Sequence, residues 1–125
     1  MILDTNGLSG VAEGAPSLEP VLRQAAEVAV PVIVLGEYRY GIRQSRHRRR
    51  YEEWLMDSLR YFRVLPVDEE TAVRYAAIRS ELKNAGTPIP ANDAWIAALC
   101  RQHSLPLVSR DRHFDHVRGL RRIEW

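Results

Sequence analysis

Four acidic residues are the best candidates for chemistry in this sequence, because each follows an apolar run or stands where a helix is expected to begin. They are Asp4, Glu37, Asp93 and Asp111. A carboxylate at the end of a buried strand is costly to keep charged unless a positive group lies among its neighbours. A divalent cation shared by several of these carboxylates would supply that positive charge.

The ligand type indicates which cation would suit such a site and what reaction it would support. Sites made only of oxygen ligands select hard cations such as Mg²⁺ and Mn²⁺, whereas zinc would call for His or Cys. The expected reaction is hydrolysis of a phosphodiester bond by a water that the cation activates. Asp4 and Asp93 would be the principal ligands. Glu37 and Asp111 would complete the cage, hold coordinated waters or accept a proton.

The histidines and the other catalytic patterns do not compete with this assignment. None of the four histidines has metal-ligand spacing near the acids. His113 and His116 lie close to Asp111 in the sequence, so a supporting role for them stays open, but solvent-exposed imidazoles are the expectation. The chain also lacks a Ser-His-acid arrangement, a phosphate-cradling glycine loop and an Asp-x-Asp pattern.

Short apolar and β-branched runs bounded by turn residues predict five strands. They cover residues 1–3, 30–34, 62–67, 105–109 and 120–125, the last as an edge strand. Helical spacing predicts helices at residues 7–13, 17–28, 37–42, 51–59, 68–83 and 94–100, and a helical turn at residues 111–117. Ser17 and Asp68 are expected to cap two of these helices, and Glu37 is expected to begin a third.

The alternation of strands and helices predicts a single α/β domain over residues 1–125, with a mostly parallel central sheet between two helical layers. In open sheets of this kind, the loops at the carboxyl ends of the strands form a crevice. Asp4, Glu37 and Asp111 each lie just past such a strand, and Asp93 starts a helix, where the helix dipole favours negative charge. Local roles stay open as well: Asp93 as a helix cap, and Glu37 as a stabiliser of its own first turn.

The charge balance favours a polyanionic partner. The sequence has 18 basic and 16 acidic residues, so its formal charge is +2. If four of the acids bound an ion, the rest of the surface would carry a charge of +6. All basic residues except Lys83 are arginine, whose guanidinium suits phosphate, although a codon bias of the genome would give the same composition. Contacts with RNA are expected at Arg39, Arg43, Arg46, Arg110 and Arg112.

Other features of the sequence indicate a cytoplasmic protein. Cys100 is the only cysteine and lies in an apolar helical run, which excludes an internal disulfide and favours a reducing compartment. No basic-then-apolar leader opens the chain, and no apolar stretch approaches the roughly 20 residues of a membrane helix. Cytoplasmic localisation is the resulting expectation.

The ordered set of motifs resembles the PIN-domain ribonucleases and, within them, the toxins of VapC type. The matching stretches are Ile2 to Asn6, Gly36-Glu37, Ile89 to Ala98 and Leu107 to Phe114, which together extend over nearly the whole chain. The resemblance implies a three-layer α/β/α PIN fold in which Asp4, Glu37, Asp93 and Asp111 hold Mg²⁺ or Mn²⁺. It also implies that Thr5 and Asn6 orient these acids. Asp115, one helical turn beyond Asp111, is a further candidate for the site or a surface acid.

The resemblance also implies two protein partners. VapC-type toxins are held in check by a small antitoxin whose C-terminal segment lies across the active-site groove and often presents an arginine to the acids. They also form homodimers through helices near the second and third strands, where Trp54, Tyr61 and Phe62 are candidate contacts or ordinary core residues. The function implied is that of a metal-dependent endoribonuclease, the toxin of a toxin–antitoxin pair. The alternative is a catalytically inactive PIN-like module with an RNA-binding or regulatory role.

Overall fold

Five short parallel strands lie at the centre of the computed structural model, which describes every residue from Met1 to Trp125. They are β1 (Ile2–Leu3), β2 (Ala29–Pro31), β3 (Arg63–Leu65), β4 (Leu107–Val108) and β5 (Arg122–Ile123), and their order in the sheet is β3-β2-β1-β4-β5. Each neighbouring pair is parallel, and Ile2 of β1 is in register with Ala29 on one side and Leu107 on the other. The carboxyl ends of all five strands therefore lie along one edge of the sheet.

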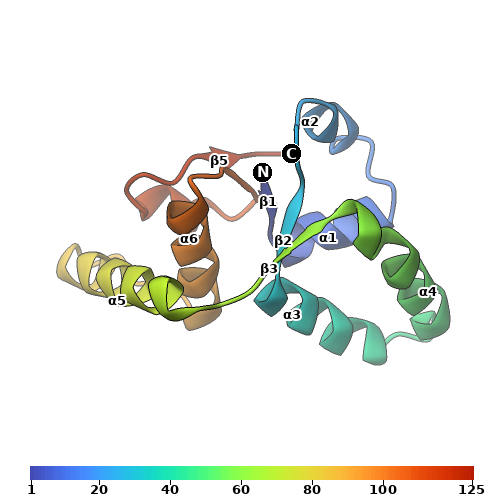
Figure 1. Cartoon of the computed structure of the whole chain (residues 1–125), viewed down its shortest axis with the longest axis horizontal. Helices are drawn as coiled ribbons and strands as arrows, with labels where there is room; N and C mark the ends of the chain where they lie inside the picture. Colours follow the sequence, from blue (N-terminus) through green and yellow to red (C-terminus); the bar gives the residue numbers. More distant parts are fainter.

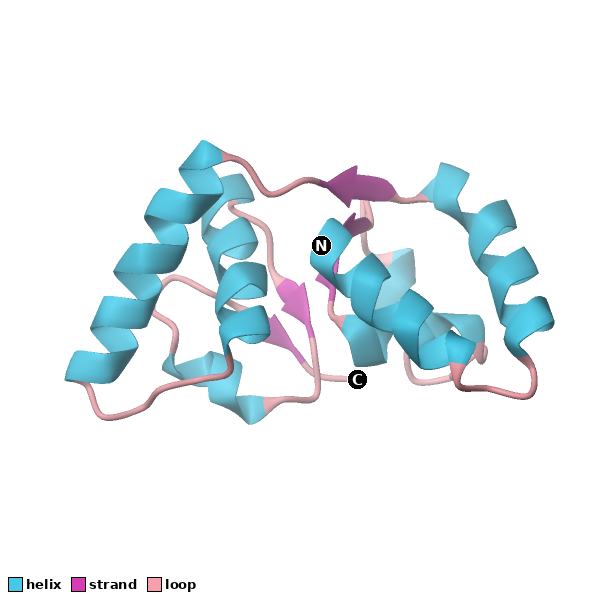
Figure 2. Ribbon diagram, turned by 90° about the horizontal axis from the view of Figure 1, so that it is seen from below, coloured by secondary structure: helices cyan, strands magenta, loops and turns pink.

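Helices cover both faces of this sheet, as the alternating pattern predicts. They are α1 (Thr5–Ala12), α2 (Glu19–Arg23), α3 (Val32–Arg43), α4 (Arg48–Ser58), α5 (Glu69–Asn84) and α6 (Ala91–His103), with short 3₁₀ helices η1 (Leu59–Tyr61) and η2 (Arg112–His116). Figure 1 shows α5 and α6 on one side of the strands and α1, α3 and α4 on the other, and the view in Figure 2 agrees. This three-layer α/β/α arrangement confirms the predicted fold class.

Apolar side chains from the strands and from α6 fill the centre of the fold. Ile2, Leu107 and Val108 are fully buried, because β1 and β4 are inner strands of the sheet with helices on both faces. The residues of α6 from Ile96 to Cys100 are all buried, as the apolar sequence there predicts. Burial raises the pKa of the Cys100 thiol to about 12, so this cysteine is an unreactive core side chain.

The second strand is shorter than the β-branched run from Val30 to Val34 predicts. It ends at Pro31, and Val32 already begins α3. Proline has no backbone N–H to continue a sheet ladder, and with φ −60° and ψ 144° it serves as the N-cap of the helix. The packing of Val34, which is fully buried, overrides the strand preference of its β-branched neighbours. Glu37 therefore lies in the second turn of α3, and the prediction that it begins the helix is wrong.

The prediction that Ser17 caps a helix is also wrong. Helix α2 has only five residues and begins at Glu19; its N-cap is Leu18, and no side chain caps it. Leu18 is buried against α1, where a Cβ on Gly10 would lie 2.7 Å from its Cδ1. Leu18 is thus a packing residue at the start of α2, and no hydrogen bond from a Ser17 side chain supports the first turn. Pro20 lies in the first turn, as predicted, where its missing N–H costs little.

The remaining elements occur where the sequence predicts them, with shifted ends. The edge strand predicted at residues 120–125 is β5, and the helical turn predicted at residues 111–117 is η2. None of the helices has both the length and the apolar character that crossing a lipid bilayer demands.

Asp68 caps α5, as predicted, through a reciprocal pair of hydrogen bonds with Thr71. The Thr71 N–H donates to Asp68 Oδ1 at 3.1 Å, and the Asp68 N–H donates to Thr71 Oγ1 at 3.0 Å. The bonds from Thr71, with a smaller contribution from Gln102, hold the pKa of the Asp68 carboxyl below its ordinary value.

Replacing Asp68 should therefore destabilise the fold only where its carboxyl is ionised. We predict that Asp68→Ala lowers the melting temperature at pH 7, because the first turn of α5 loses its acceptor. A carboxyl whose pKa is lowered in the folded state adds stability above its unfolded pKa and loses it as the pH falls through the folded value. In thermal melts, the difference from wild type should thus shrink below about pH 4. Glu69→Gln, which removes the neighbouring charge but no cap, should cause no comparable loss, and an equal loss would contradict the capping role.

Candidate active site

Asp4 is the most buried of the four acids. It follows β1, caps α1 and is only 4% exposed. Its Oδ1 accepts the Gly7 N–H at 2.7 Å. Glycine suits this position because a Cβ there would lie 3.2 Å from Asp4 Oδ1 and 3.3 Å from the carbonyl oxygen of Val108. The carboxylate of Asp4 is thus held at the N-terminus of α1, at the carboxyl edge of the sheet.

Glu37 reaches the same edge from α3. The Thr5 hydroxyl donates to Glu37 Oε1 at 3.1 Å, so the residue directly after Asp4 ties α1 to α3. This contact gives Thr5 an orienting position beside the acids. Asn6, the other residue expected to orient them, is exposed, and none of the side-chain hydrogen bonds of the site involves it.

Asp93 lies in the first turn of α6 and meets His113 of η2 across the site. Asp93 Oδ2 and His113 Nε2 are 2.9 Å apart, although the N–H does not point along this line closely enough for a well-formed hydrogen bond. The N-cap of α6 is Pro90, and no side chain caps this helix, so Asp93 is not a capping residue. His113 is not the solvent-exposed imidazole that the sequence predicts, because its ring packs on buried Phe114 and contacts Asp93.

Asp111 is positioned by a residue that the sequence reasoning missed. Ser109 follows β4 and is fully buried, and its Oγ accepts the Asp111 N–H at 3.0 Å. The Ser109 side chain also acts on Asp4, whose pKa it lowers, so one hydroxyl serves two of the acids. The signal in the sequence was a polar residue directly after the apolar pair Leu107-Val108, at the point where a buried strand must end.

The four carboxylates lie close enough for their charges to act on one another, although they come from four separate segments. Burial is the main cause of the raised pKa of Asp4, and the charges of Asp111 and Glu37 raise it further. Burial also raises the pKa of Asp93; the charge of His113 opposes this shift, and the charges of Asp111 and Glu37 add to it. The acids therefore form one electrostatic cluster at the carboxyl edge of the sheet, which we call the acidic cluster.

The chemistry of the acidic cluster fits a hard divalent cation. Its donors are all carboxylate oxygens, and Asp4, Glu37 and Asp111 form no ion pair with a basic side chain. No three acidic, His or Cys side chains are arranged so that they could hold a metal ion directly. Because Mg²⁺ usually keeps several waters and takes only one or two carboxylates as direct ligands, the other acids can act through those waters. The cluster thus suits a hydrated cation better than a closed cage of four ligands.

Asp115, the further acid suggested beside Asp111, is engaged elsewhere. Its two oxygens accept from the guanidinium of Arg122 on β5, at 2.8 Å and 3.1 Å. This pairing lowers the pKa of Asp115, and Asp115 is not among the charges that shift the pKa of Asp4 or Asp93. It therefore anchors η2 to the edge strand and stands outside the acidic cluster.

The arginines expected to contact RNA differ in how free their guanidinium groups are. Arg110 is engaged with Trp125: its Nε donates to the Trp125 carbonyl oxygen at 3.0 Å, and its guanidinium lies 3.6 Å from the centre of the indole ring. The other four are exposed and form no ion pair; they are Arg39, Arg43, Arg46 and Arg112. An anionic ligand can therefore approach from the side of α3 and from η2.

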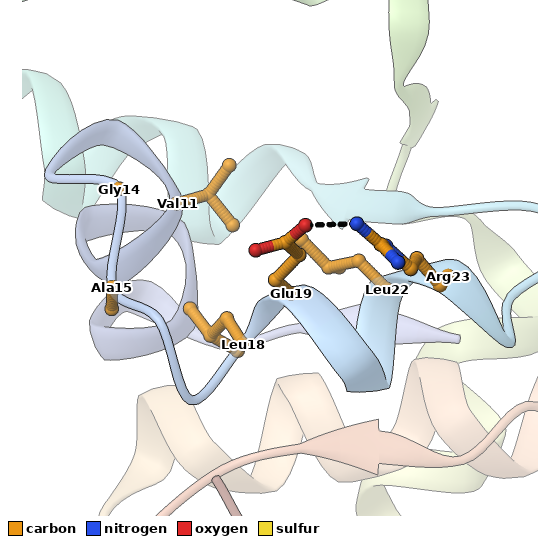
Figure 3. A pocket seen from close by; sticks show the side chains of 7 residues that line it. All are labelled: Val11, Gly14, Ala15, Leu18, Glu19, Leu22 and Arg23. Atoms are coloured by element: carbon orange, nitrogen blue, oxygen red, sulfur yellow. Dashed lines mark hydrogen bonds and ion pairs between the residues drawn. The ribbon is translucent and has the colours of Figure 1, made fainter.

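A hollow of about 460 Å³ lies between α1 and α2, apart from the acidic cluster. Figure 3 shows Val11, Leu18 and Leu22 around it, with the ion pair of Glu19 and Arg23 at its rim. None of the four acids lines this hollow, so the largely apolar space and the acidic cluster are separate features of the surface.

Known proteins resemble this chain over nearly its whole length, and residues 1–120 match the profile of the PIN domain. Ribonuclease VapC2 of Haemophilus influenzae is 33% identical over 128 residues, covering 99% of this chain and 96% of that protein. Toxin FitB of Neisseria gonorrhoeae is 32% identical over 123 residues, covering 89% and 87%. The structure of VapBC-5 from Mycobacterium tuberculosis, a member of the VapBC family of toxin–antitoxin systems, superposes with a TM-score of 0.79 at 27% identity, covering 99% and 97%. The parallel sheet, the acidic cluster at its carboxyl edge and these similarities establish that the chain belongs to the PIN-domain family, among the ribonucleases and toxins of VapC type.

Proposed function

We propose that this protein is a metal-dependent endoribonuclease and the toxin of a toxin–antitoxin pair. The observation that carries the proposal is the single cluster formed by Asp4, Glu37, Asp93 and Asp111 at the carboxyl edge of the parallel sheet. The ribonuclease and toxin names of similar proteins support RNA as the substrate. A Mg²⁺ or Mn²⁺ ion bound there would lower the pKa of a water molecule and neutralise charge that develops on the phosphate.

The residues of the acidic cluster would divide their roles by burial and by the bonds they already make. Asp4 is fixed by the first turn of α1 and shielded from solvent, so it suits a direct ligand of the ion. Asp93, in the first turn of α6, would be the second direct ligand. Glu37 is held through one oxygen by Thr5, which leaves the other free to position a water or accept its proton. Asp111 would hold a coordinated water from η2.

The partner proposed for this site is an antitoxin segment that carries an arginine. A crowded acidic cluster in which three of the four carboxylates lack a basic partner attracts guanidinium much as it attracts a metal ion. Such a segment would fill the crevice at the sheet edge and exclude both ion and RNA. The VapBC and FitB relatives support this assignment.

A homodimer is also part of the proposal. Trp54 and Phe62, two of the three aromatic residues that the sequence suggests for the interface, pack together with ring centroids 6.4 Å apart, which is a core role. Tyr61 is instead 75% exposed, and it closely precedes β3, the edge strand of the sheet, where Val64 is exposed too. An open sheet edge with apolar side chains is a surface that a second copy of the chain would cover.

The alternative, a catalytically inactive module that binds RNA or regulates, explains less of the structure. Asp4 does cap α1, as that alternative requires. Glu37, Asp93 and Asp111 make no cap hydrogen bond to their helices, yet their charges act on one another or on Asp4. Capping alone gives no reason for four like charges to gather at one edge, because each raises the cost of ionising the others.

Metal binding should be measurable without RNA. We predict that Mg²⁺ or Mn²⁺ stabilises the wild-type fold, by about 2.7 kcal/mol when the metal is at a hundred times its Kd. Without metal, Asp4→Asn should melt above wild type at pH 7, because a carboxyl whose pKa is raised in the folded state costs stability once it is ionised. The amide still accepts the Gly7 N–H. The variant should also lose most of the metal-induced rise in thermal melts. An Asp4→Asn protein that melts below wild type would contradict this electrostatic account.

RNA cleavage tests the proposed activity directly. Purified protein incubated with an RNA pool and Mg²⁺ or Mn²⁺ should produce defined cut ends, mapped by sequencing, and chelator should abolish them. Asp4→Asn should lower the rate at least about a hundredfold. Asp115→Asn is the matched control, because it removes a nearby carboxylate outside the acidic cluster, and it should keep most of the activity. Metal-dependent cleavage at the wild-type rate by Asp4→Asn would remove Asp4 from the mechanism.

Binding of RNA should weaken with salt if the free arginines of α3 and of the loop that follows it contact phosphates. Replacing Arg39, Arg43 and Arg46 together by Gln should lower the slope of log affinity against log salt by about 0.7 for each lost phosphate contact. Fluorescence anisotropy of labelled single-stranded RNA in chelator would measure this slope without cleavage. Arg49→Gln, whose side chain is exposed and paired with Glu53, is the control and should change the slope little. An RNA affinity that does not change with salt concentration would exclude the arginine–phosphate interface.

A further inference from the structure

A cationic hollow lies beside the hairpin of α5 and α6 and shares no residue with the acidic cluster or with the arginines of α3. Its volume is about 490 Å³, and it is lined by Arg79, Ser80, Leu82 and Lys83 of α5 and by Pro88 and Ile89 of the following loop. Leu82 and Ile89 are buried, so the hollow has an apolar floor with two cations at its rim. We call it the α5 hollow.

The two cations of the α5 hollow have no acidic partner. Arg79 and Lys83 stand four residues apart on α5, so they share one face of the helix and repel each other. Neither forms an ion pair, whereas Arg74, one turn earlier, pairs with Glu70, and Glu81 pairs with Arg101. The positive charge at this point is thus unneutralised within the chain, and an anion would relieve the repulsion.

Aromatic contacts hold Arg79 in place and connect it to α6. Its Nη1 donates to the Tyr75 hydroxyl at 2.7 Å, and its guanidinium lies 5.5 Å from the centre of the Tyr75 ring. Tyr75 stacks on Trp95 of α6, with ring centroids 3.8 Å apart and planes 13° from parallel. Trp95 stands on the same helix as Asp93, so these contacts connect the hollow to the helix that carries one of the four acids. Because the side chain of Arg79 is already ordered, binding an anion costs it less conformational entropy.

The chain path places the α5 hollow next to the helix that carries Asp93. Pro88 and Ile89 line the hollow, Pro90 caps α6, and Asp93 lies in the first turn of that helix. Figure 2 shows α5 and α6 side by side, joined by this loop. A ligand in the hollow therefore lies beside the start of α6. A polymeric ligand could occupy the hollow and the acidic cluster together.

We propose that the α5 hollow binds a backbone phosphate of the RNA strand, away from the bond that is cut. A guanidinium and an ammonium at one rim suit the oxygens of a phosphate, and the Ser80 hydroxyl adds a donor. The apolar floor of Leu82, Pro88 and Ile89 suits the sugar or base attached to that phosphate. The proposal rests on the proposed ribonuclease function, and it makes the hollow a positioning subsite that orients the substrate.

Binding and cleavage by five variants would test the proposal. Arg79→Gln, Lys83→Gln and the double variant are compared with Arg74→Gln, a control on the same helix whose arginine already pairs with Glu70. In chelator, the double variant should bind single-stranded RNA several-fold more weakly than the control, with a salt slope lower by about 0.7 for one lost phosphate contact. Arg79→Lys with Lys83 intact should keep most of the slope but bind more weakly than wild type, because lysine lacks the planar fork. All these side chains are exposed, so melting curves should match wild type.

The outcomes separate this proposal from the nuclease function. If the double variant and Arg74→Gln bind RNA equally, the hollow is not a phosphate site, whatever the activity. If the slope falls as expected while wild type never cleaves RNA, the hollow stands as an RNA contact and the proposed function fails. A dinucleotide has only one backbone phosphate, the one that is cut, so nothing is left for the hollow to bind and the double variant should cleave it at the wild-type rate. An equal loss on short and long RNA would overturn the positioning role. An acidic peptide that competes as well as RNA of equal charge would overturn the assignment to RNA.

Discussion

Ionising Asp4 inside this fold is unfavourable, because its side chain is buried and the charges of Asp111 and Glu37 act on it. Only the Gly7 N–H and the Ser109 hydroxyl offset this cost, and neither carries a full positive charge. The same parallel connections that bury the inner strands bring the acids to one edge, so the need for a cation follows from the topology itself.

Patterns in the sequence predicted the elements whose formation depends on the local order of apolar and polar residues. β1, β4 and α6 are recognisable in the sequence because their apolar runs lie in the core. The end of β2 at Pro31 was missed because the β-branched run around it favours a strand, although proline has no N–H with which to continue the ladder. The positions of Asp4 and Asp111 follow from parallel topology. His113 was missed because its contact with Asp93 joins segments far apart in the sequence, and the effect of Ser109 on Asp4 is equally distant. The bond from Ser109 to Asp111 is local, but a single polar residue after an apolar pair does not by itself indicate a site.

Two acids of one short segment show how the fold decides which carboxylates stay unneutralised. Asp111 and Asp115 lie four residues apart, so from the sequence alone both are candidates for the site. The edge strand β5 supplies Arg122, which forms a bidentate pair with Asp115 and leaves Asp111 without a basic partner. A strand at the margin of the sheet thus determines the composition of the acidic cluster, because a charge that is already paired adds little to the field that attracts an ion.

The arginines are distributed in a way that serves both an ion and an anionic substrate. Arg48 and Arg49 are paired with acids on their own helix. Cations without an acidic partner include Arg39 and Arg43 of α3, Arg79 and Lys83 of α5 and Arg112 of η2. A guanidinium of the chain that reached Asp4 or Glu37 would neutralise the cluster and occupy the place of the ion permanently. The free cations instead raise the local concentration of a polyanion without contacting those two acids. The cluster is therefore open to an ion from solution or to an arginine from another protein, and these two occupants exclude each other.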